Sequence, residues 1–129
     1  MSSIAEVRGN EEQLKITALF KGGGAAADCV IQTTSHKMVS GLKYNAATGT
    51  FNIVLTEWPG VLVGCDVGTA PTAGGVPHTA TVDFANVSKT AFTVPVYFKA
   101  AATDTVAAAA VDPATTCYIQ VELTFQKSA

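Results

Sequence analysis

The chain has 129 residues, a formal net charge of −2, 14% charged residues and 48% hydrophobic residues. This length fits one domain with a self-sufficient core, because a domain usually takes roughly 100 to 200 residues. No Lys or Arg lies between Tyr44 and Ser88, which argues against nucleic acid as a partner because phosphate binding needs a basic surface.

Residues 1–13 show no strict hydrophobic alternation and are predicted to form an N-terminal arm. Ile4 and Val7 are apolar side chains of this arm and are candidate interface residues. Residues 14–129 are predicted to form a single β-sandwich domain. The first residues lack the charged and apolar regions of a secretory signal, so we expect synthesis and folding in the cytoplasm.

Six short runs rich in Val, Ile, Thr or Phe predict strands in the first two thirds of the chain. They cover residues 14–20, 29–34, 38–44, 50–55, 61–67 and 79–84. Turn-forming residues separate these runs, at residues 22–24, 45–49, 58–60 and 68–77. The three glycines at 22–24 are interpreted as a flexible turn, since no Gly-Lys-Ser/Thr follows them.

Two further strands are predicted in the last third, at residues 92–98 and 117–126, where apolar and polar residues alternate strictly. Pro95 is expected to restrict the first of them to a sheet edge or a bulge, because proline cannot donate to a ladder. The Ala-rich residues 100–114 are predicted to form an extended loop with at most one helical turn.

About eight short strands at regular spacing predict an all-β fold, an antiparallel β-sandwich of jelly-roll-like type. The order of the strands stays open, because short strands of similar pattern permit many pairings.

No catalytic, cofactor-binding or metal site is predicted. Neither His36 nor His78 has a ligand at the short spacings of zinc sites. A pair of Cys65 with His78 lacks any local signature of a nucleophile. Asp66 and Glu57 are interpreted as solvated turn residues and not as a glycosidase pair. We therefore expect a protein that is not an enzyme.

The three cysteines, Cys29, Cys65 and Cys117, are odd in number and far apart. This spacing favours buried reduced thiols over a disulfide framework. No apolar run approaches the roughly 18 residues of a membrane span, so no membrane partner is expected.

Trp58, the sole tryptophan, lies in a predicted corner at residues 57–60. We interpret it as a plug at the end of the sandwich, with an interface anchor or a ligand platform as alternatives. Tyr97 and Tyr118 are expected on the faces opposite the apolar rows, either as ordinary exposed residues or beneath a partner subunit. All three are candidate interface residues.

Three blocks of the chain, residues 41–67, 92–98 and 117–128, resemble the head decoration (capsid cement) proteins of tailed bacteriophages. The shared pattern is a turn, a glycine, a strand, a Trp-Pro corner and a second strand, followed by a long final hairpin. The resemblance implies a structural virion protein, a dimer or trimer that binds the outer capsid surface. Such a protein clamps neighbouring major capsid subunits and stabilises the shell.

Residues 1–13 and 68–77 are expected to carry the contacts to the shell, because they lack a core pattern. Another phage structural component, such as a tail or head-completion protein, is the first alternative, and a closed ring would favour it. A small carbohydrate-binding β-sandwich that uses Trp58 or Tyr97 is the second alternative.

Overall fold

The computed structural model describes residues 13–35, 37–71, 78–100, 112–113, 115 and 117–127. It contains eight strands and a single 3-10 turn, η1 (Phe84–Asn86). The strands are β1 (Gln13–Lys21), β2 (Val30–Thr34), β3 (Val39–Asn45), β4 (Thr50–Leu55), β5 (Val61–Pro71), β6 (His78–Val82), β7 (Thr93–Ala100) and β8 (Cys117–Gln126). The predicted loop at 100–114 and the predicted arm at 1–13 lie almost entirely outside the described residues.

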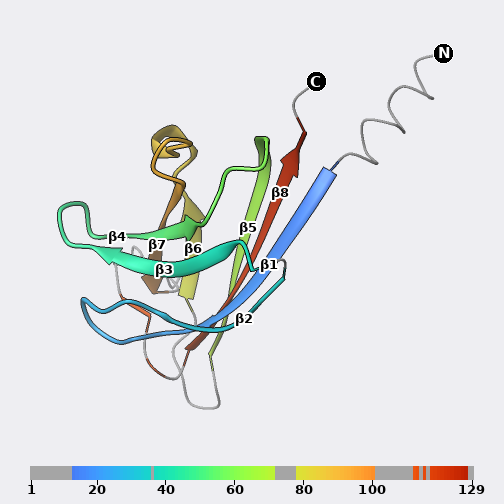
Figure 1. The fold of residues 1–129 in the computed structure, drawn as a ribbon. Coiled ribbons are helices and arrows are strands. Elements are labelled where there is room, and N and C mark those ends of the chain that lie inside the picture. The colour runs from blue at the N-terminus through green and yellow to red at the C-terminus, as the bar shows by residue number, and fades with distance from the viewer. Residues whose placement is uncertain are drawn as a thin grey trace.

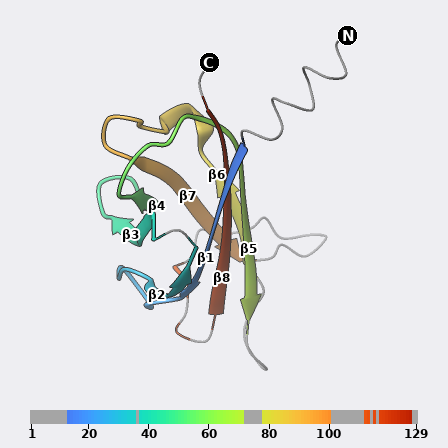
Figure 2. The ribbon, with the colours of Figure 1, turned by 45° about the vertical axis from the view of Figure 1, so that its right-hand side comes forward.

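Two antiparallel four-stranded sheets face each other (Figures 1 and 2), which confirms the predicted all-β sandwich. The strand order is β2-β1-β8-β5 in one sheet, here sheet A, and β3-β4-β7-β6 in the other, sheet B. The first and last strands are neighbours, since β1 pairs with β8 along its whole length from Gln13 to Lys21. The two inner strands of sheet A, β1 and β8, are therefore the first and the last strand in the sequence.

Apolar residues that alternate along the strands of both sheets fill the space between the sheets. The largest fully buried side chains from sheet A are Ile16, Phe20, Ile119, Leu123 and Phe125. Those from sheet B are Leu42, Phe51, Ile53, Val94, Val96 and Phe98. Each such side chain stabilises the fold by about 1.5–3 kcal/mol relative to exposure, so this double row holds the sandwich together.

Strand β2 confirms the strand predicted at residues 29–34, and four of its five residues are exposed. It lies at the outer edge of sheet A and pairs only with β1 in that sheet. Its sequence, Val-Ile-Gln-Thr-Thr, has no alternation, and the structure buries neither face.

Two strand ends differ from expectation. Strand β5 continues to Pro71, although a turn was predicted from Gly68 onward, and it pairs with β8 as far as Cys117. Strand β6 ends at Val82, and Phe84 begins the 3-10 turn. The predicted shell-binding loop at 68–77 is thus strand in its first part, and residues 72–77 lie outside the described residues.

The prediction that Pro95 confines its strand to an edge or a bulge is wrong. Strand β7 lies between β4 and β6, and Pro95 is buried and paired with Asn52 of β4. The Pro95 carbonyl accepts the Asp83 N–H at 2.9 Å, on the β6 side, where β6 has already ended at Val82. The missing N–H of Pro95 faces the same side, so the ladder with β4 loses no bond and only the reciprocal bond to Asp83, beyond the end of β6, is absent.

Candidate binding surfaces

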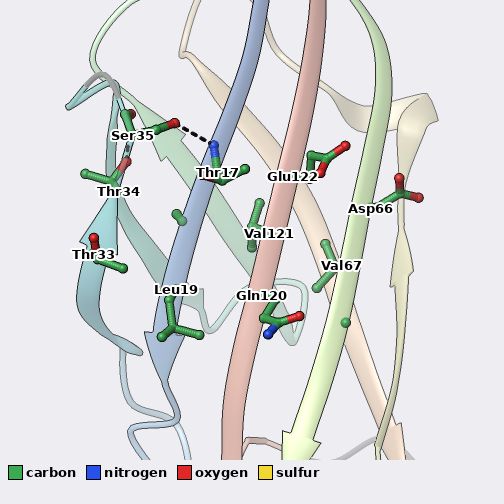
Figure 3. A pocket seen from close by; sticks show the side chains of 12 residues that line it. Thr17, Leu19, Thr33, Thr34, Ser35, Asp66, Val67, Gln120, Val121 and Glu122 are labelled. Carbon is green, nitrogen blue, oxygen red and sulfur yellow. Dashed lines mark hydrogen bonds between the residues drawn. The ribbon is translucent and has the colours of Figure 1, made fainter.

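A groove of about 560 Å³ crosses the outer face of sheet A, away from sheet B (Figure 3). Two rows of outward-facing residues on β1, β8 and β5 form its walls, and the backbone between the rows forms its floor. The first row is Thr17, Glu122 and Asp66, and the second row is Leu19, Gln120 and Gly68. We call this feature the sheet A groove.

Hydroxyl groups at the end of β2 close one end of the sheet A groove. The Ser35 Oγ accepts the Thr17 N–H at 2.8 Å, and the Ser35 N–H donates to the Thr17 carbonyl at 2.8 Å (Figure 3). Thr33 and Thr34 also line this end. At the other end Gly68 has no side chain, and a Cβ placed there would meet nothing within 4 Å. The groove is therefore open beside β5.

The first wall of the groove is acidic. Glu122 and Asp66 are direct register partners on β8 and β5, and such pairs place their Cβ atoms about 5 Å apart. Lys15 Nζ lies 3.8 Å from Glu122 Oε1, the one salt bridge among the described residues. Asp66 has no salt bridge among the described residues, so this ammonium group offsets the charge of Glu122 only. Like charges directly opposite each other on neighbouring strands repel.

A second pocket, of about 300 Å³, lies on the outer face of sheet B. Its lining residues are Asn45, Thr48, Thr50, Asn52, Asp83, Asn86, Thr93 and Pro95. Asn86 Nδ2 donates to Asp83 Oδ2 at 2.7 Å, so the single carboxylate is already hydrogen-bonded. This pocket offers mainly amide and hydroxyl groups.

Exposed aliphatic side chains lie on both edge strands of sheet A. Val30 and Ile31 are on β2, Val61 and Val63 are on β5, and their exposed fractions run from 39% to 56%. Val63 falls at a register shift between Leu62 and Gly64, which is a bulge-like interruption of the pairing with β8. Sheet A therefore ends in an apolar edge on each side.

Trp58, the first candidate interface residue, lies half-buried in the corner between β4 and β5 and packs against the core. This position agrees with the plug that we favoured, and a role at an interface stays a prediction. Tyr97 and Tyr118 lie half-buried on the outward faces of β7 and β8. Lys99 Nζ lies 5.7 Å from the centroid of the Tyr97 ring, within cation–π range.

The structure does not bring these candidate residues together. Tyr118 is one row from the sheet A groove, where it pairs with Lys21 and Ala70. Tyr97 follows Pro95 on the outward face of β7, beside the sheet B pocket. Ile4 and Val7 lie outside the described residues.

The cysteines match the prediction of reduced thiols, since Cys29, Cys65 and Cys117 are all free and buried. Burial raises the pKa of Cys29 to about 11, that of Cys65 to about 12, and also that of Cys117. Thiols with a raised pKa are poor nucleophiles at neutral pH. These side chains therefore act as small core residues.

The ionisable residues of the described segments do not gather into a cluster of three or more that would suit a metal ion. The Nδ1 atom of His78 is buried and has no hydrogen-bond partner among the described residues. His36 lies outside them. No helix in the described part of the chain is long and apolar enough to cross a membrane.

Sequence reasoning did not find the sheet A groove. Alternation placed Gln120 and Glu122 on the outer face of their strand, but Asp66 was interpreted as a turn residue, whereas it lies within β5 opposite Glu122. The missing information was the pairing of β5 with β8, which the sequence pattern does not specify. Comparisons with protein-family models, curated proteins and solved structures find no match to this chain.

Proposed function

We propose that this chain is a non-catalytic structural protein of a virus particle, which binds the outer capsid surface and cements neighbouring major capsid subunits. The observation that carries the proposal is the pair of apolar edges of sheet A, at β2 and at β5. A strand at a sheet edge has unpaired backbone groups and can add a strand from a partner. Two such edges on opposite sides of one sheet suit a clamp that joins two neighbours.

The low charge of the chain supports the same role. With 14% charged residues, large parts of the surface can be covered by another protein without desolvating many charges. A shell also presents many identical sites, so modest contacts at each edge add up to strong retention. The resemblance to capsid cement proteins in residues 41–67, 92–98 and 117–128 leads to the same function.

Light scattering of the purified protein, followed by co-sedimentation with empty heads of the phage or prophage that encodes it, tests this proposal. We expect a dimer or trimer that saturates the heads at a fixed stoichiometry and protects them against heat. Ile31→Lys and Val63→Lys, one on each edge, should each weaken binding, whereas Thr90→Lys in an exposed turn should not. A protein that stays in the supernatant contradicts the proposal, and a closed ring indicates a tail or head-completion component.

The sheet B pocket favours one other function, the binding of a carbohydrate. Amide and hydroxyl groups line it, and Tyr97 lies beside it on β7, which is a composition suited to a hydroxyl-rich ligand next to an aromatic ring. In an NMR titration with a panel of oligosaccharides, amide shifts at Asn52 and Thr93 that vanish in Asn52→Ala would support this function. Unchanged spectra across the panel would refute it.

A further inference from the structure

We propose that the sheet A groove binds a basic side chain, an arginine or a lysine, that an extended segment of a partner protein inserts between the two rows of side chains. This inference deepens the proposed function and rests on it for the identity of the partner, the capsid subunit.

The shape of the groove fits a slender group. The two walls are two residues apart along each strand, so the distance between them is about 7 Å. The groove crosses the neighbouring strands β1, β8 and β5, which are about 4.8 Å apart. The groove is closed by Ser35 at the β2 end and open beside Gly68 at the β5 end. A long unbranched side chain can therefore enter from the β5 edge and lie along the floor.

The charge of the groove selects a cation. Glu122 and Asp66 lie directly opposite each other, and among the described residues the one salt bridge, from Lys15, goes to Glu122. Asp66 has no salt bridge within the described residues. A cation placed between the two carboxylates would be attracted by both and would remove their mutual repulsion.

The neutral groups complete the recognition. The hydroxyl of Thr17 and the amide oxygen of Gln120 are acceptors on opposite walls, and a guanidinium group carries five N–H donors in a fixed plane. Leu19 on the second wall gives apolar contact to the methylene stem that Arg and Lys share. Because a guanidinium can donate to several acceptors at once, arginine is preferred to lysine.

Two other occupants are less suited. The chain's own residues 1–12 contain Arg8 but also Glu6, Glu11 and Glu12, so this segment is net negative and is repelled by the acidic wall. An oligosaccharide usually stacks on an aromatic ring, and none of the described residues that line the groove is aromatic.

An NMR titration of the full chain with the peptide acetyl-Gly-Arg-Gly-amide tests the inference, with the citrulline peptide as an uncharged twin. We expect the arginine peptide to shift the backbone amides of Thr17, Gln120, Glu122 and Asp66, with an apparent affinity at least about tenfold above that of the citrulline peptide. The difference should shrink in high salt. Equal shifts from both peptides, shifts at other residues, or an oligosaccharide that shifts the same amides would each overturn the inference.

Charge variants sharpen this test. Asp66→Asn combined with Glu122→Gln should weaken binding of the arginine peptide by at least about tenfold, whereas Lys15→Gln should strengthen it by removing the competing ammonium group. Glu57→Gln is the matched control, because Glu57 is an exposed carboxylate outside the groove. If the double variant binds the peptide like the wild-type protein, the inference fails.

Co-sedimentation with the heads separates this inference from the proposed function. If the double variant is lost from the heads while the wild-type protein is retained, both stand. Heads that retain the double variant as well as the wild-type protein would leave the capsid role intact and overturn the groove as the contact. A groove that binds the arginine peptide in a protein that ignores the heads would contradict the capsid role alone.

Discussion

The indole ring of Trp58 meets the ring of Phe125 edge to face, with centroids 5.0 Å apart and ring planes at 86°. Trp58 belongs to the corner that connects sheet B to sheet A, and Phe125 lies near the end of the inner strand β8. The contact therefore fixes the corner between the two sheets to the core. Such aromatic pairs contribute about 0.5–1.5 kcal/mol beyond the burial of their area.

Replacing Trp58 should loosen this corner. We expect Trp58→Ala to lower the free energy of unfolding by about 2 kcal/mol. This loss is smaller than that for a fully buried tryptophan, because the Trp58 side chain is half-buried. Trp58→Phe should lower the free energy of unfolding by less, since this variant keeps an aromatic ring against Phe125. Urea unfolding followed by circular dichroism measures both changes. A loss no larger than that of the exposed control Val61→Ala would show that the contact does not stabilise the fold.

Two glycines, Gly60 just before β5 and Gly68 within β5, form a matched pair. A Cβ at Gly60 would overlap with the backbone oxygen of Gln126, whereas a Cβ at Gly68 would meet nothing within 4 Å. We expect Gly60→Ala to destabilise the protein by about 1–3 kcal/mol, because the corner has to move away from β8. Gly68→Ala should change stability by less than about 0.5 kcal/mol. Equal thermal midpoints for the two variants would disprove this close approach.

Stability should fall at alkaline pH because of the buried thiols. The pKa values of Cys29 and Cys65 in the folded protein, about 11 and about 12, exceed the ordinary thiol pKa of 9.0, because burial disfavours the thiolate. Above pH 9 the unfolded chain therefore releases protons that the folded protein still holds. The stabilisation is complete below this pH and is lost as the pH rises to about 11 and 12.

Urea unfolding at several pH values between 8 and 11 measures this loss. We expect the slope for the wild-type protein to be steeper than that for Cys65→Ala, by up to about 1.4 kcal/mol per pH unit. All other ionisable groups are common to both proteins, so their contributions cancel in the comparison. Parallel curves would mean that Cys65 ionises equally easily in the folded and unfolded chains.

The acidic wall of the sheet A groove should also be visible in stability. Asp66→Asn removes the repulsion with Glu122. We expect it to raise the free energy of unfolding by about 0.2–1 kcal/mol. The gain should decrease with added salt. Lys15→Gln should have an effect of similar size and opposite sign, because it removes the exposed ion pair. A destabilised Asp66→Asn protein would show that this carboxylate has a stabilising partner.

The strands were predictable because their chemistry is local. Strict alternation in residues 117–126 identifies β8 and its buried face, and the predicted 50–55 matches β4 (Thr50–Leu55) at both ends. The start of β7 was harder to predict from local sequence. The predicted strand began at Phe92, but Phe92 has a positive φ of 59° and lies just outside β7. A bulky residue rarely adopts this conformation; Phe92 packs against the core, and its carbonyl accepts the Leu55 N–H at 2.9 Å.

The pairing of the strands was not predictable, and the candidate surfaces depend on it. The position of Asp66 beside Glu122 requires β5 to pair with β8, which joins segments far apart in sequence. Pro95 was assigned to an edge because the end of β6 at Val82 is invisible in the local pattern. The exposure of Val30 and Ile31 likewise follows from the place of β2 at the end of sheet A.

The pairing of β1 with β8 has a consequence for biosynthesis. Among the described strands of sheet A, β5 pairs with β8 alone, and β1 has only the short β2 until β8 is translated. Sheet B, by contrast, uses strands that are all translated before β8. During translation the nascent chain can therefore complete sheet B first, and it exposes the apolar faces of β1 and β5 until Cys117–Gln126 leaves the ribosome. Ribosome stalling within β8 would then yield an aggregation-prone fragment in place of a smaller folded domain.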